Sequence, residues 1–118
     1  MMLNYAVFGT DDLAAAGAFY DALFEGEGLS RLMPSERMIY WLGEGFAFAV
    51  ARPFDGAAAS NGNGTMIGFA LDSEAKVRLL HGRALELGGT CEGAPGPRGP
   101  KYSAYVRDPD GNKLCFAC

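Results

Sequence analysis

The sequence predicts an α+β fold in which a strand-helix-strand-strand-strand module (βαβββ) occurs twice, with the two mixed sheets cupped around a cleft. Each half of the 118-residue chain contains one helical pattern placed between strand patterns. A segment without apolar periodicity separates the halves. We expect one domain built from a first module at residues 1–51, a linker at residues 52–64 and a second module at residues 65–118.

The first module begins with a strand pattern at residues 3–8, which leads into a helix. Thr10, Asp11 and Asp12 supply oxygens that can cap this helix, and the alanine-rich run after them favours it. Three more strands are predicted at residues 29–33, 37–42 and 46–50. Residues 34–36 and 43–45 separate them and are typical of hairpin turns.

The second module repeats this order. A strand at residues 65–71 precedes a cap at Asp72 and Ser73 and a helix at residues 74–87. The elements predicted after the helix are a short strand at 90–92, a Pro/Gly-rich loop at 93–100 and an antiparallel pair at 102–107 and 113–117. Proline, glycine and the short polar side chains of residues 108–112 give the pair a strong turn signal.

Composition and charge exclude several classes of function. A chain with 49% hydrophobic and 20% charged residues is typical of a globular protein, and its net charge of −4 without a Lys/Arg cluster argues against a nucleic-acid partner. No apolar run approaches the ~20 residues that span a bilayer, and no secretion signal is evident. We therefore expect a cytoplasmic protein without a membrane partner.

The cysteines favour neither a disulfide framework nor a structural zinc site. Cys91, Cys115 and Cys118 are odd in number and lack zinc-type spacing. Reduced thiols are the expectation.

Three motifs carry a family resemblance across essentially the whole chain. With Asp11-Asp12-Leu13, the Phe19-Tyr20 pair and the turn at residues 108–112, the sequence resembles the vicinal oxygen chelate superfamily, which includes glyoxalase I, bleomycin-resistance proteins and extradiol dioxygenases. The resemblance implies the cupped two-module fold and a homodimer. In metal-using members it also implies a divalent cation, held by His, Gln or Glu from the first and last strands of each half.

The positions that match those ligands are Tyr5, Met66 and Cys115. Residues 45–51, which contain the last predicted strand of the first half, have no side-chain donor. Phenol, thioether and thiol form a poor donor set for Mg, Mn, Ni, Zn or Fe. Soft copper(I) could accept Met66 and Cys115, although nothing else in the sequence supports it. The expectation is a chain without a metal or any other cofactor.

No catalytic residue is assigned. Cys115 is a candidate nucleophile, but a small apolar residue lining the cleft is the favoured interpretation. His81 lies within the second predicted helix, where a surface or packing role is favoured over that of a base.

Other residues are candidates for ligand binding. Aromatic rings could form a pocket wall or belong to the core, arginines beside prolines could anchor an anion or remain solvated, and tyrosine hydroxyls could reach the cavity. Besides Tyr5, these candidates are Trp41, Phe48, Arg52, Arg98, Tyr102 and Tyr105.

The leading hypothesis is a glyoxalase/bleomycin-resistance-like protein that lacks the usual metal ligands and binds or sequesters a small organic molecule in the cleft between the modules. An alternative is a metal-dependent lyase, similar to lactoylglutathione lyase, or a dioxygenase with displaced ligands. Glu44, Asp55, Glu92 or His81 would then converge on the cavity. A third possibility is an oligomerisation or partner-binding module.

Overall fold

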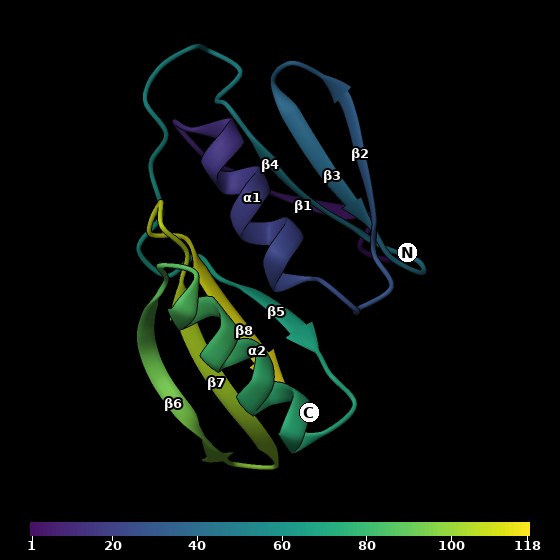
Figure 1. Cartoon of the computed structure of the whole chain (residues 1–118), viewed down its shortest axis with the longest axis vertical. Helices are drawn as coiled ribbons and strands as arrows, with labels where there is room; N and C mark the ends of the chain where they lie inside the picture. Colours follow the sequence, from purple (N-terminus) through teal and green to yellow (C-terminus); the bar gives the residue numbers. More distant parts are fainter. The chain divides into compact units, whose positions relative to one another are not determined.

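A computed structural model describes residues 1–118, which divide into two compact units, Met1–Asn61 and Gly62–Cys118. Each unit contains one four-stranded mixed sheet and one helix that packs on a face of that sheet (Figure 1). The first unit consists of β1 (Tyr5–Gly9), α1 (Leu13–Leu23), β2 (Ser30–Ser35), β3 (Met38–Leu42) and β4 (Ala47–Ala51). The second consists of β5 (Ile67–Ala70), α2 (Glu74–Glu86), β6 (Thr90–Arg98), β7 (Lys101–Arg107) and β8 (Lys113–Ala117).

The two sheets share one topology. Their strand orders are β1-β4-β3-β2 and β5-β8-β7-β6, and in each sheet the first strand pairs in parallel with the last. Both units therefore have the βαβββ order that the sequence predicts. The pairing places the first strand of each unit next to the last, so Gly68 lies beside Cys115 in the second sheet.

Both helices begin at the residues that the sequence indicates. The Asp12 carboxylate accepts a hydrogen bond from the Ala15 N–H at 3.0 Å, and the Ser73 hydroxyl accepts one from the Lys76 N–H at 3.1 Å. These caps satisfy amides that have no partner within the helix. Gly88, with φ of +99°, follows the end of α2.

Two segments predicted as turn or loop belong to edge strands instead. β6 continues to Arg98, through the region predicted as a loop at 93–100, and β2 continues through Pro34 to Ser35. An edge strand leaves one side of its backbone unpaired, so it tolerates proline, and both strands show register shifts against their neighbours. The prolines and glycines of these segments therefore led to predicted turns and loops where the backbone stays extended.

The cores beneath the two helices differ in chemistry. Rings fill the first, where Tyr20 of α1 and Phe24, the residue that caps its C-terminus, lie within 6.0 Å, centroid to centroid, of the rings of Trp41 and Phe48. Aliphatic side chains dominate the second, together with Phe116. Its buried hydrophobic members are Val77, Leu80, Ala84, Ala104, Val106, Leu114 and Phe116.

The turn between β7 and β8 is organised by one buried carboxylate. Asp108 accepts hydrogen bonds from the backbone N–H groups of Asp110 and Asn112, at 3.0 and 2.9 Å, and from the Asn112 side chain at 3.1 Å. Gly111 adopts a φ of +89°, which favours glycine. The predicted chain reversal is confirmed, and this network explains it. No helix in the chain has the length and apolar character needed to cross a membrane.

Candidate functional site

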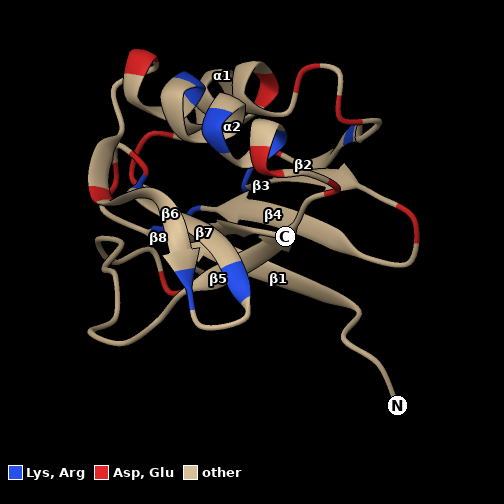
Figure 2. Ribbon diagram, turned by 90° about the horizontal axis from the view of Figure 1, so that it is seen from below, with Lys and Arg blue, Asp and Glu red and all other residues tan.

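Each sheet has an open face, defined as the face opposite its own helix. In the first unit this face carries Tyr5 and Val7 of β1, with Tyr40 and Leu42 of β3 across the alanines of β4. Tyr5 is 49% exposed, and its ring meets that of Tyr40 edge-on at a centroid distance of 5.9 Å. Neither β1 nor β4 contains a charged residue (Figure 2). The first open face is therefore apolar.

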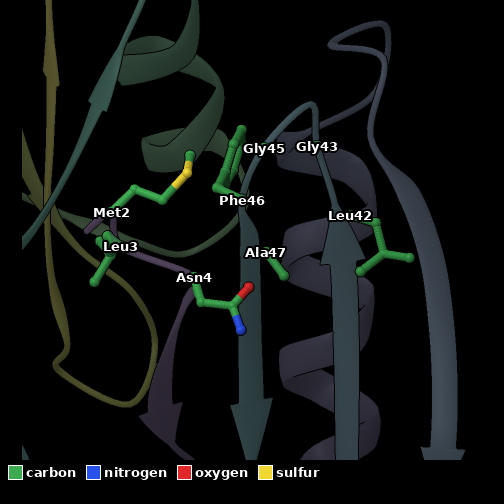
Figure 3. A pocket seen from close by; sticks show the side chains of 8 residues that line it. All are labelled: Met2, Leu3, Asn4, Leu42, Gly43, Gly45, Phe46 and Ala47. Carbon is green, nitrogen blue, oxygen red and sulfur yellow. The ribbon is translucent and has the colours of Figure 1, made fainter.

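A pocket of about 510 Å³ adjoins this face (Figure 3). Leu42 and Ala47 belong to both the face and the pocket. They lie on the open face because Ala47 pairs with both Tyr5 and Leu42, and both of them also line the pocket. Asn4 supplies the only polar side chain among the lining residues, which are Met2, Leu3, Asn4, Leu42, Gly43, Gly45, Phe46 and Ala47. The Phe46 ring packs closely over Gly43, where a Cβ atom would lie 2.3 Å from it and would force the ring to shift. The volume falls in the range of about 300–1,000 Å³ typical of small-molecule sites.

The second open face is polar and positively charged around a thiol. Cys115 stands in register between Gly68 and Tyr105. The guanidinium carbon of Arg98 lies 5.0 Å from the centroid of the Tyr105 ring, and the Lys113 ammonium lies 5.3 Å from it. Two cations therefore lie against the Tyr105 ring, and the positive charge of each favours the thiolate form of Cys115.

Burial controls the chemistry of Cys115, which is 8% exposed. Desolvation raises the pKa of this thiol, whereas a hydrogen bond with Tyr105 and the charges of Arg98 and Lys113 act in the opposite direction. Because burial has the larger effect, Cys115 remains a neutral thiol near pH 7. A neutral thiol is a weak nucleophile, which is consistent with the favoured interpretation of Cys115 as a small lining residue.

The two arginines proposed as anion anchors have different surroundings. Arg98 donates to the backbone carbonyls of Ser103, Ala94 and Gly96, so its guanidinium fastens β6 to β7. Arg52 follows β4 and lines a smaller pocket of about 200 Å³ together with Thr10 and Asp11. Of the two, Arg52 has the surroundings of a ligand contact.

Trp41, Phe48 and Tyr102 lie on the helix-facing sides of their sheets, away from the open faces. Trp41 is 2% exposed and Phe48 is 1% exposed, and the Trp41 indole N–H donates to Asp21 of α1 at 3.0 Å. The Tyr102 hydroxyl accepts a hydrogen bond from Arg78 of α2 at 3.2 Å. These contacts give all three residues a packing role in this structure.

Comparison with known proteins agrees with this architecture. The sequence profile of the Glyoxalase/Bleomycin resistance protein/Dioxygenase superfamily matches residues 2–116. The chain belongs to this superfamily. A glyoxalase/bleomycin resistance protein from Albidiferax ferrireducens T118 is 35% identical, with a TM-score of 0.92 over 99% of this chain and 98% of that one.

More distant members of the superfamily share the fold. A glyoxalase/bleomycin resistance protein/dioxygenase family enzyme from Burkholderia phytofirmans PsJN is 21% identical, with a TM-score of 0.81 over 99% of this chain and 98% of that one. Lactoylglutathione lyase from Agrobacterium tumefaciens is 22% identical, with a TM-score of 0.74 over 98% and 92%. No curated protein matches the chain.

The residues at the superfamily's metal-ligand positions do not fit a metal of the usual kind. Tyr5 and Cys115 lie on open faces, and Met66, which is 45% exposed, immediately precedes β5. Their phenol, thiol and thioether are unsuited to the hard or borderline cations that imidazole and carboxylate hold. No group of three or more His, Cys, Asp or Glu side chains is placed to hold a metal ion. Glu92, considered as a displaced ligand, pairs with Arg107, which lowers the pKa of Glu92.

Sequence reasoning did not identify Lys113 beside Cys115 or the pocket of the first unit. The register of the β7–β8 hairpin could have revealed the former, because a turn at residues 108–112 pairs Tyr105 with Cys115 and places Lys113 two residues away on the same face. The pocket depends on how residues 2–4 pass the β3–β4 turn. No sequence signal predicts that placement.

Proposed function

We propose that this superfamily member binds or sequesters a small apolar organic molecule on the open face and pocket of its first unit, without a metal of the superfamily type. The observation that carries the proposal is the apolar row of Tyr5, Ala47 and Leu42, which crosses β1, β4 and β3 in register and leads into the pocket. A ligand that contacts this row would bury apolar surface, and each Å² buried would stabilise the complex by about 25 cal/mol.

The polar groups at this surface suit orientation rather than chemistry. The Tyr5 hydroxyl and the Asn4 amide can each form hydrogen bonds with a ligand, and no His, Cys, Asp or Glu side chain lines the pocket. Together with the neutral Cys115 thiol of the second unit, this favours binding over turnover.

A fluorescence titration with N-phenyl-1-naphthylamine, a neutral apolar dye, tests the proposal. We expect saturable binding that is unchanged by EDTA. Leu42→Asp should weaken it about tenfold, equivalent to about 1.4 kcal/mol, because a carboxylate is introduced into the lining of the apolar pocket. Leu79→Asp is the matched control, since Leu79 is an exposed leucine of α2 in the second unit.

Dye binding that does not saturate, or that both substitutions weaken equally, would contradict the proposal. Binding that disappears in EDTA and returns with a divalent metal would instead favour a metal-dependent protein.

A further inference from the structure

The second unit contains a thiol–imidazole pair that takes no part in the site described above. His81 Nε2 of α2 lies 3.3 Å from Cys91 Sγ of β6. Cys91 stands in register with Val106, whose side chain is buried against the helix, so the thiol lies on the helix-facing side of the sheet. Two consecutive elements, α2 and the edge strand β6, thus bring a nucleophile and a base within hydrogen-bonding distance.

The two partners have complementary environments. His81 is only 7% exposed, and burial lowers its pKa, so the imidazole is neutral near pH 7 and able to accept a proton. Cys91 is an exposed residue of an edge strand and is not bonded to another cysteine. A buried base therefore holds a thiol that small molecules can approach from solvent.

We propose that Cys91, with His81 as its general base, is a modification site for low-molecular-weight aliphatic disulfides. Of the three cysteines, only Cys91 has a hydrogen-bonded imidazole.

The reaction is a thiol–disulfide exchange. The imidazole accepts the Cys91 proton, and the thiolate attacks one sulfur of the disulfide R–S–S–R. A Cys91–S–S–R bond forms as the R–S–S–R bond breaks. The departing thiolate R–S⁻ takes the proton from the imidazolium, so the small disulfide is the oxidant and the leaving thiol is its reduced product.

The rate of modification of each cysteine by 2-hydroxyethyl disulfide, resolved by peptide mass spectrometry on the reduced full-length protein, tests the proposal. Native Cys91 should react faster than the same cysteine in the urea-unfolded chain. Folding reduces the access of the reagent to a thiol, so a higher rate in the folded protein requires activation by His81. His81→Gln should slow Cys91 by at least about tenfold, below the range of about 10²–10⁴ that positioned bases provide. Cys118 serves as the internal control and should be unaffected.

Circular dichroism establishes that His81→Gln is folded. If it is not, the comparison of native with unfolded wild-type protein decides the question alone. A native Cys91 that reacts no faster than the unfolded thiol would overturn the proposal, as would a folded His81→Gln variant whose Cys91 rate is unchanged.

Discussion

The two units share a topology, yet their helix-facing cores and open faces have opposite chemistry. The first has an aromatic core and an apolar open face with a pocket. The second has a largely aliphatic core containing His81, and an open face on which the charges of Arg98 and Lys113 act on Cys115. The two units reach the same βαβββ arrangement with different side chains, which decide the polarity of each surface and which groups respond to pH.

Phe48→Ala should have the largest effect on this comparison. Phe48 contacts Tyr20, Phe24 and Trp41, so its truncation should lower the free energy of unfolding by about 3–5 kcal/mol. Trp41 is the only tryptophan, and its fluorescence during denaturation therefore reports the first unit. Phe54→Ala is the control, because Phe54 is 91% exposed. Equal effects of the two substitutions would disprove the assignment of the aromatic core.

Asp108→Ala should weaken the second unit by about 1.5–3 kcal/mol, because the turn loses a buried charged acceptor of three hydrogen bonds. The reactivity of the buried Cys115 thiol towards an alkylating reagent reports opening of this unit and should increase. Asp55→Ala is the comparison, since the Asp55 carboxylate accepts one exposed hydrogen bond from Ala57. A Cys115 rate that does not change would contradict the role of the turn.

Lowering the pH should destabilise the second unit through protonation of His81. Burial lowers the pKa of His81 from 6.5, so the unfolded chain binds its proton first as the pH falls. The stability that His81 contributes is present above the unfolded pKa and is lost as the pH falls towards the folded one. Urea midpoints between about pH 7.5 and about pH 5.5 should therefore fall more in the wild type than in His81→Gln. Parallel profiles would exclude this contribution.

Alkaline pH should produce a smaller effect through Cys115. Burial raises the pKa of this thiol above 9.0, so its contribution to stability is present below that pH and is lost as the pH rises through the folded pKa. Above pH 9.0, the urea midpoint should therefore fall less steeply with rising pH in Cys115→Ala than in the wild type. An unchanged slope would show that ionisation of Cys115 does not differ between the folded and unfolded chains.

The sequence predicted the fold more completely than the site. Helix caps at Asp12 and Ser73 and the turn at Asp108 are local signals, and the structure confirms all three. β6 was underestimated because prolines that break a central strand are tolerated at an edge.

The side-chain candidates were harder to predict. Tyr102 and Tyr105 were both candidates whose hydroxyls could reach the cavity, but a separation of three residues in a strand places them on opposite faces. Trp41 and Phe48 illustrate a different difficulty, since an aromatic residue in a strand suits either a pocket or a core. Only the packing of α1 decides for the core. The proximity of His81 to Cys91 depends on how α2 docks on an edge strand, which sequence spacing does not specify.

The metal content of the folded protein most directly tests the claim that this superfamily member does not use the usual metal. Elemental analysis after incubation with Ni, Zn, Mn and Fe should find no stoichiometric metal, and the thermal midpoint should be the same with these ions and with EDTA. One equivalent of any of these metals per chain, together with a midpoint that EDTA lowers, would contradict the account.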